Sequence, residues 1–174
     1  VTGAGQGNGR AIALGLAAHG ADVVVTDIDT VAAQQTADDV SARGRRGWSY
    51  TLDVTDADAC AALAKTVGAE IGPVAILVNN AGIIIRETID SPRAHDNWRR
   101  VLDVNLNGVF NVTHAFLPAL RQTRGSIINI GSIASFVGVA DTLGYSPSKG
   151  GVKLLTQSLA RELARDGIRV NAIA

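Results

Sequence analysis

Short apolar runs alternate with helical patterns along the whole chain, and this alternation limits the folds that it can adopt. The apolar runs lie at residues 21–27, 48–54, 74–79, 126–132 and 168–173. The helical patterns lie at residues 9–19, 30–43, 56–71, 96–122 and 145–166. Runs without polar interruption, such as residues 74–78, are typical of parallel strands that are covered on both faces. The alternation therefore predicts an α/β fold, in which right-handed crossovers build a doubly wound parallel sheet with helices on both faces.

Residues 2–9 form a glycine-rich loop, and a helical pattern follows it directly. Every second residue from Gly3 to Gly9 is a glycine. Glycine permits unusual backbone angles and lets the chain approach a pyrophosphate closely, which then lies at the N-terminus of the helix. A flexible linker is also rich in glycine, but no helix needs to open from it. The pattern therefore favours a dinucleotide-binding loop.

Asp27 ends the first apolar run and lies 20 residues beyond Gly7. A carboxylate at this remove accepts hydrogen bonds from the adenosine ribose of a dinucleotide. The same carboxylate would repel the 2′-phosphate of NADP, and neither Gln6 nor Ile28 supplies a compensating positive charge. The sequence therefore favours NAD over NADP as the cofactor.

Tyr145, Lys149 and Ser132 together have the composition of a proton-transfer site. The tyrosine and the lysine are four residues apart, so they share one helix face with Cβ atoms about 5–6 Å apart. A free phenol has a pKa of about 10, and a neighbouring ammonium favours the phenolate and lowers this pKa. Ser132 closes the apolar run at residues 126–132, which predicts a place at the carboxyl end of a strand, where open α/β sheets bind ligands.

Together these motifs resemble those of the short-chain dehydrogenase/reductase family, over essentially all 174 residues. The loop at residues 2–9 resembles the cofactor loop of the family, and the Asn-Asn-Ala-Gly sequence at residues 79–82 resembles its sheet-stabilising segment. Ser132, Tyr145 and Lys149 resemble its catalytic trio. The three-residue spacing between the first two family glycines is similar to that of the simple alcohol and carbonyl oxidoreductases. It differs from that of the extended epimerases and dehydratases.

The resemblance implies an NAD-dependent oxidoreductase with a Rossmann-type fold, which transfers a hydride between a secondary alcohol, or its ketone, and nicotinamide. Tyr145 would exchange the hydroxyl proton, Lys149 would lower the pKa of the phenol and contact the nicotinamide ribose, and Ser132 would stabilise charge on the reacting oxygen. Asn105 falls where the family has a fourth catalytic residue, which connects the lysine to bulk water. An amide on this apolar stretch needs partners, so it could also stabilise an irregularity of the helix.

The resemblance also implies which residues hold the cofactor. Asp53 and Val54 would contact the adenine ring, while Thr55 or Asp56 beside them could simply cap the next helix. Asn8 replaces a residue that is more often isoleucine in the family, without removing a glycine. The implied cofactor residues are Gly3, Gln6, Gly7, Asn8, Gly9, Asp27, Ile28, Asp53, Val54, Asn80, Ala81, Gly82, Tyr145 and Lys149.

Charge and composition disfavour several other classes of function. Sixteen basic and sixteen acidic residues cancel, so nothing attracts nucleic acid or an anionic membrane. No apolar run approaches the ~20 residues that span a bilayer, and the three histidines lack metal-ligand spacing. The arginines at residues 43–46 are expected to form a solvated loop, and Cys60 is expected to be a small buried apolar residue. We expect a cytoplasmic enzyme with a small-molecule substrate and no metal.

The helix predicted at residues 96–122 is apolar on most of its circumference, which indicates burial on most sides. Burial within one subunit is one explanation. The resemblance implies another, in which this helix and the helix at residues 145–166 pack against their symmetry mates in a homodimer or homotetramer.

Residues 1–174 are expected to form a single domain that carries both the cofactor and the catalytic residues and that is truncated at both ends. Only Val1 precedes the glycine loop, although a strand normally comes first, and the family continues beyond the last strand into a substrate lid. The small apolar residues 134–140 are compatible with a polyol, a 3-oxoacyl thioester or a steroid as substrate. A regulatory subunit that binds the dinucleotide without turnover is the alternative function.

Overall fold

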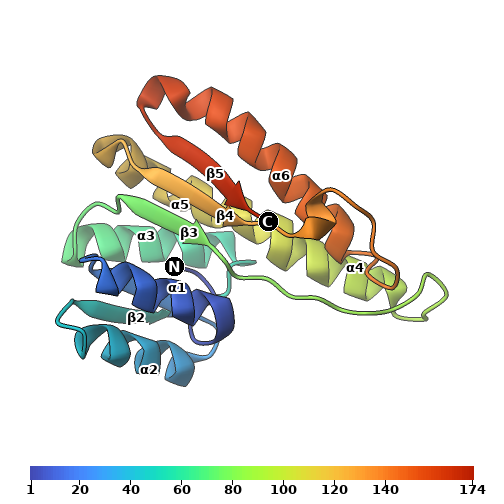
Figure 1. Cartoon of the computed structure of the whole chain (residues 1–174), viewed down its shortest axis with the longest axis horizontal. Helices are drawn as coiled ribbons and strands as arrows, with labels where there is room; N and C mark the ends of the chain where they lie inside the picture. Colours follow the sequence, from blue (N-terminus) through green and yellow to red (C-terminus); the bar gives the residue numbers. More distant parts are fainter. The chain divides into compact units, whose positions relative to one another are not determined.

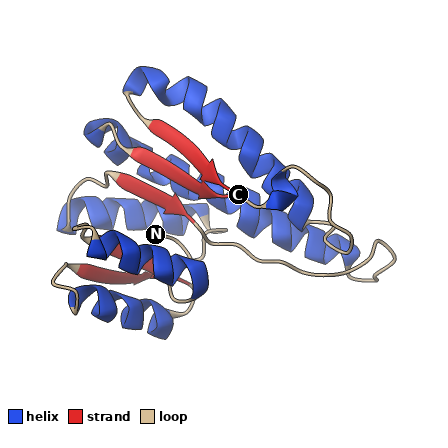
Figure 2. Ribbon diagram, in the orientation of Figure 1, coloured by secondary structure: helices blue, strands red, loops and turns tan.

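The structure is a computed structural model that describes residues 1–174, and the chain forms two compact units. Unit 1 comprises Val1–Asp53 and Asn79–Ala81, and unit 2 comprises Val54–Val78 and Gly82–Ala174. Helices alternate with strands in both (Figures 1 and 2). The α/β class expected from the sequence is confirmed, and each predicted strand lies within two residues of its expected start. That the two units act as one domain stays a prediction.

Unit 1 contains a pair of parallel strands, in which Val23 lies opposite Gly47 and Asp27 lies opposite Thr51. The start of the chain runs beside the first of these strands, because Thr2 forms a parallel bridge with Thr26. The elements of unit 1 are α1 (Gly7–Ala18), β1 (Val23–Asp27), α2 (Thr30–Ser41) and β2 (Gly47–Thr51).

Small residues set the close packing of unit 1. Its buried core consists of alanines from the loop, α1 and α2 against valines of β1 and α2. A Cβ atom at Gly47 would lie 2.2 Å from the carbonyl oxygen of Ala37, so α2 approaches β2 as closely as backbone atoms allow. The side chain of Asp29 accepts a hydrogen bond from Ala32 N at 3.0 Å and thereby caps α2, which fixes where this helix begins after β1.

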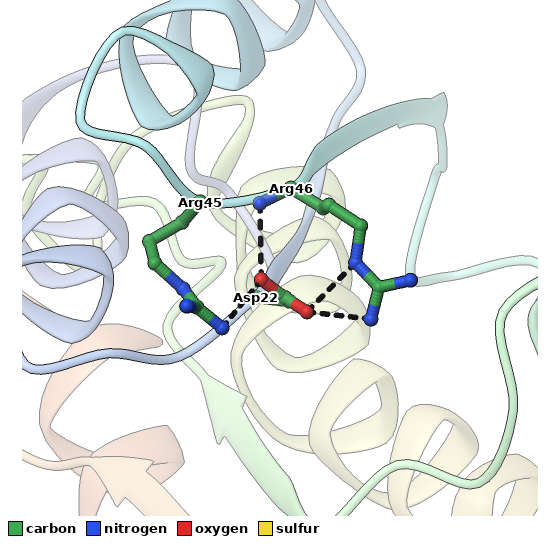
Figure 3. A network of polar contacts seen from close by, with 3 residues as sticks. All are labelled: Asp22, Arg45 and Arg46. Atoms are coloured by element: carbon green, nitrogen blue, oxygen red, sulfur yellow. Dashed lines mark hydrogen bonds and ion pairs between the residues drawn. The ribbon is translucent and has the colours of Figure 1, made fainter.

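Asp22 binds two arginines at the start of the β1–β2 pair (Figure 3). Its carboxylate accepts hydrogen bonds from the main-chain N, Nε and Nη2 of Arg46, and it forms an ion pair with Nη2 of Arg45 at 2.8 Å. The backbone and side-chain hydrogen bonds from Arg46, followed by the charges of both arginines, lower the pKa of Asp22. The basic cluster is exposed at Arg46, as expected for a loop, but Arg45 and Arg46 are paired with Asp22 and tie the loop before β2 to the start of β1.

Unit 2 contains a sheet with the strand order β3-β4-β5, in which β4 and β5 are parallel. Helix α3 packs against α5, while α6 packs against β5 and against the segment that precedes α5. Its elements are α3 (Ala57–Glu70), β3 (Ile76–Asn79, whose last residue belongs to unit 1), α4 (Ala94–Leu102), a π-helix η1 (Asp103–Asn107), α5 (Gly108–Thr123), β4 (Ser126–Ile130), the short η2 (Ile133–Ser135), α6 (Tyr145–Glu162), η3 (Leu163–Asp166) and β5 (Arg169–Ile173).

The long helix predicted at residues 96–122 is therefore interrupted. A turn of π-helix separates α4 from α5, and Asn105 lies in the middle of this turn. Gly108 begins α5 where a Cβ atom would lie 2.6 Å from Cγ2 of Val54, so the helix continues in close contact with the segment before α3. Single turns of π-helix occur often at functional sites.

Candidate active site

Thr2 and Asn80 hold the glycine loop of unit 1 in place. The hydroxyl oxygen of Thr2 accepts hydrogen bonds from the main-chain N atoms of Asn80 and Ala81, both at 3.1 Å. In return, Nδ2 of Asn80 donates to the carbonyl oxygens of Thr2 and Gly3, both at 2.9 Å. A segment 78 residues away in sequence thus clamps the start of the loop. The sequence did not predict this role for Thr2, although the threonine precedes the first glycine.

Two of the loop glycines are required by these close contacts. A Cβ atom at Gly3 would lie 2.8 Å from Cα of Ala81, and one at Gly9 would lie 2.2 Å from the carbonyl oxygen of Gly3. Gly7 is different, because no atom lies within 4 Å of its Cβ position, although its φ of 53° is positive like the φ of 59° at Gly3. The loop is therefore tightly packed at Gly3 and Gly9, while its outer part around Gly7 is open.

The N-terminus of α1 lies in this open part. Gln6, Gly7 and Asn8 are exposed, and no side chain caps the first turn. The first N–H groups of a helix have no intrahelical acceptors and carry a partial positive charge, so they bind phosphate. A glycine cradle next to an uncapped helix N-terminus fits the pyrophosphate of a dinucleotide.

Asp27 ends β1 beside the same loop. Its Oδ2 accepts a hydrogen bond from Gly5 N at 2.8 Å, and its Oδ1 accepts one from Asp29 N at 3.1 Å. Each carboxylate oxygen has a second lone pair for a ribose hydroxyl. Ile28, which follows it, is 72% exposed. The two backbone donors fix the orientation of the carboxylate, and a Cβ atom at Gly5 would lie 3.0 Å from Oδ2.

The residues after β2 divide between the two roles that the sequence left open. Asp56 caps α3, because its side chain accepts a hydrogen bond from Ala59 N at 2.9 Å. Asp53 is exposed, whereas Val54 is buried and its carbonyl accepts a hydrogen bond from Nδ2 of Asn111 at 3.0 Å. The capping role therefore belongs to Asp56, and contact of Asp53 and Val54 with adenine stays a prediction.

Lys149 and Tyr145 lie close together in the first turns of α6. The lysine Nζ lies 5.8 Å from the centre of the tyrosine ring. It donates a hydrogen bond to the carbonyl oxygen of Ile130, the last residue of β4, at 2.6 Å. Only 5% of Lys149 is exposed, and this burial lowers its pKa from 10.5 to about 8. The structure thus pairs the predicted tyrosine and lysine.

Ser132 lies two residues beyond β4 and caps the short helix η2. Its Oγ accepts a hydrogen bond from Ala134 N at 3.1 Å, while its own N–H donates to Oγ of Ser135 at 3.2 Å. The half-buried hydroxyl retains its proton for donation to a substrate oxygen. The predicted position at the end of a strand is correct.

Asn105 is fully buried, and both the oxygen and the nitrogen of its amide are hydrogen-bonded. Its Oδ1 accepts a hydrogen bond from Ile83 N at 2.7 Å, and its Nδ2 donates to Ile83 O at 2.8 Å. Nδ2 also donates to Oγ of Ser148 at 3.1 Å. The side chain therefore stabilises the helix irregularity and joins it to the segment after Gly82. Ser148 was not among the site residues predicted from the sequence. The feature that could have indicated it is a hydroxyl side chain between Tyr145 and Lys149.

The structure brings together no group of three or more histidine, cysteine, aspartate or glutamate side chains that could hold a metal ion. No helix has the length and apolar character needed to cross a membrane.

The sequence profile of the short chain dehydrogenase family matches residues 1–174, the whole chain. The chain belongs to this family. The 3-oxoacyl-(acyl-carrier-protein) reductase FabG of Staphylococcus aureus is 41% identical over 176 aligned residues, which cover 100% of the chain and 71% of the relative. The cyclohexanol dehydrogenase of an Acinetobacter species is 37% identical, over 99% of the chain and 69% of the relative.

A solved structure agrees with this membership. A metagenomic short-chain oxidoreductase in complex with NADP has a TM-score of 0.91 and 36% sequence identity, over 99% of the chain and 78% of that protein. The fold is the doubly wound, Rossmann-type α/β fold that the sequence predicted, and the chain is a short-chain dehydrogenase whose family binds nicotinamide dinucleotides.

Proposed function

We propose that this short-chain dehydrogenase prefers NAD and interconverts a secondary alcohol and its ketone. One observation carries the proposal: a buried lysine ammonium lies 5.8 Å from the ring centre of Tyr145. A positive charge in a poorly solvated place favours the phenolate. A regulatory subunit that only binds the dinucleotide has no need for this pair.

Each residue then has a defined task. Tyr145 takes the proton of the substrate hydroxyl during oxidation and returns it during reduction. Lys149 stabilises the phenolate and keeps N–H donors for the nicotinamide ribose, because its bond to Ile130 uses only one of three. Ser132 donates a hydrogen bond to the reacting oxygen. When bound, the nicotinamide accepts or supplies the hydride.

Asn105 is proposed to act through its neighbours. Its amide holds the main chain of Ile83 and the hydroxyl of Ser148. The water link between Asn105 and Lys149 that the family resemblance implies remains part of the proposal.

The preference for NAD rests on Asp27. Backbone donors at Gly5 and Asp29 hold its carboxylate at the end of β1, so it cannot easily turn away from a 2′-phosphate. One relative of known structure is in complex with NADP, so membership of the family does not decide the cofactor. The fixed carboxylate favours NAD in this chain.

The proposed substrate is a small molecule with apolar surface. Exposed apolar side chains follow Ser132 at Ile133, Phe136, Val137 and Val139. They favour a 3-oxoacyl thioester, a steroid or a cyclic alcohol over a polyol. Two relatives are named for reduction of a 3-oxoacyl group and for oxidation of cyclohexanol.

The proposed assembly is a cytoplasmic homodimer or homotetramer. Large apolar side chains remain exposed on the helices that the sequence indicated: Trp98 on α4, Phe110 on α5 and Leu154 on α6. Contact between equivalent helices of two subunits would bury them.

The test is a cofactor titration beside a turnover screen, with the full-length protein. We expect nicotinamide fluorescence to report NAD binding, and a panel of secondary alcohols and ketones to yield turnover that Tyr145→Phe lowers by a factor of about 100 or more. Tight NAD binding with no turnover across the panel would instead favour the regulatory subunit.

A further inference from the structure

Two buried hydroxyls on α6 make the same pair of hydrogen bonds. Ser148 donates to the carbonyl oxygen of Tyr145 at 2.7 Å and accepts from Nδ2 of Asn105 at 3.1 Å. Thr156 donates to the carbonyl oxygen of Val152 at 2.7 Å and accepts from a buried asparagine of β4 at 2.9 Å. The two residues are eight positions apart in α6, and both are buried.

The two pairs differ in what they connect. Thr156 joins the middle of α6 to the strand β4. Ser148 joins the first turn of α6 to the π-helix, where Asn105 also holds the main chain of Ile83 through two hydrogen bonds. The carbonyl that Ser148 binds belongs to Tyr145, and Lys149 directly follows Ser148 in the chain. A continuous set of hydrogen bonds therefore runs from Ile83 to the main-chain carbonyl of Tyr145.

We infer that Ser148 is a positioning residue for the proposed reaction, and this inference rests on the proposed function. Its hydroxyl fixes the first turn of α6 against the π-helix, and so fixes Tyr145 and Lys149 relative to the segment after Gly82. Ser148 touches neither substrate nor cofactor in this role. A hydroxyl inside a helix would otherwise gain little, since it competes with the backbone for the same carbonyl.

Removal of each hydroxyl allows a matched comparison. Ser148→Ala and Thr156→Val each delete one hydroxyl and keep the remaining shape. Each leaves a buried asparagine N–H group with one acceptor fewer, so both variants are expected to lose stability by a similar amount. Only Ser148→Ala loosens the turn that carries Tyr145. A difference in turnover between the two variants therefore reports position and not general stability.

The experiment measures kcat, KM, the Kd for NAD and the melting temperature of the full-length variants. A displacement of about 1 Å can slow a chemical step by roughly 100-fold, so we expect Ser148→Ala to lower kcat by about tenfold or more. We expect its Kd for NAD to stay within about twofold, because Ser148 does not touch the cofactor. We expect kcat of Thr156→Val also to stay within about twofold, because Thr156 binds β4 and not the turn that carries Tyr145. Ser148→Thr retains the hydroxyl and should recover most of the lost turnover.

Equal kcat losses in Ser148→Ala and Thr156→Val would overturn the inference, as would wild-type kcat in Ser148→Ala. If Ser148→Ala does not fold, Ser148→Cys makes the same comparison, because a thiol is only a weak donor and acceptor. The Tyr145→Phe variant tests the proton-transfer role of Tyr145 separately from the positioning role of Ser148. Loss of turnover in Tyr145→Phe together with equal effects at Ser148 and Thr156 refutes only the positioning role. Retained turnover in Tyr145→Phe refutes the proton-transfer role of Tyr145, and no turnover of the wild type on any substrate of the panel refutes the proposed function itself.

Discussion

Lys149 donates a hydrogen bond from Nζ to the carbonyl oxygen of Ile130, with 2.6 Å between the two atoms. Ile130 is the last residue of β4, and Ser132 follows two residues later. The bond thus fixes a buried ammonium at the carboxyl end of a strand, beside Tyr145. A side chain that is 5% exposed loses most of its hydration, which costs stability while it is charged.

Replacement of Lys149 by methionine should therefore stabilise the protein at neutral pH. Burial lowers the pKa of Lys149 from 10.5 to about 8, which corresponds to about 3 kcal/mol before the loss of its hydrogen bond is counted. As the pH rises through 8, the folded state releases this proton first, and the unfolded state binds more protons up to pH 10.5. The wild type therefore gains stability over this window.

Melting temperatures at pH 7 and at about pH 10 check this prediction, because the advantage of Lys149→Met should shrink as the wild-type lysine loses its charge. Lys65→Met, at an exposed position of α3, is the control and should show no such change. An advantage that is the same at both pH values would show that Lys149 carries no burial penalty.

The residues of the Lys149 site could be predicted from the sequence, but their connections could not. Tyr145 and Lys149 are four residues apart on a helix, so local geometry alone brings them together. Ser132 closes an apolar run, and the strand β4 ends two residues before it. The hydrogen bond from Lys149 to Ile130, by contrast, depends on how α6 packs beside β4, which no local pattern describes.

The π-helix at Asp103–Asn107 shows the same limit for the fold. The apolar pattern at residues 96–122 predicts one long helix. The extra residue in a turn of π-helix leaves the apolar composition of this segment almost unchanged. The irregularity is stabilised by Asn105, which binds the main chain of Ile83, 22 residues away. The clamp of Thr2 by Asn80 is likewise a contact over 78 residues. Such partners are determined by the tertiary fold.

Tyr145→Phe should lower kcat by a factor of about 100 or more, the usual scale for the loss of a general acid or base. The Kd for NAD should change little, because the ring remains and only the phenolic oxygen is lost. Tyr50→Phe removes the same atom from β2 and is the matched control. Steady-state kinetics and fluorescence titration make the comparison. Near-normal turnover in Tyr145→Phe would mean that another group moves the proton.

Asp27→Ala should reduce the preference for NAD over NADP. In the wild type we expect NAD to bind at least about tenfold more tightly, a difference of about 1.4 kcal/mol. The carboxylate that repels a 2′-phosphate is held by Gly5 N and Asp29 N, and the alanine variant removes its charge. Titration of both cofactors measures the ratio. Asp22→Asn, which neutralises a carboxylate paired with Arg45 and Arg46, should leave the ratio unchanged. Equal affinities in the wild type would refute the assignment.

Two glycines of α1 should respond in opposite ways to the same substitution. A Cβ atom at Gly9 would lie 2.2 Å from the carbonyl oxygen of Gly3 and 2.5 Å from Nδ2 of Asn80. Gly9→Ala must therefore push the loop away from its clamp, and we expect a lower melting temperature and a large loss of NAD affinity.

Gly15 lies in the same helix with open space around its Cβ position. Gly15→Ala should stabilise the protein by about 0.5–1 kcal/mol, because alanine loses less backbone entropy on folding. Thermal melts and NAD titrations of the two variants provide the test. If Gly9→Ala binds NAD as tightly as Gly15→Ala does, the close approach of loop and helix is not needed for the cofactor. The contact between Gly9 and Gly3 would then be a matter of packing alone.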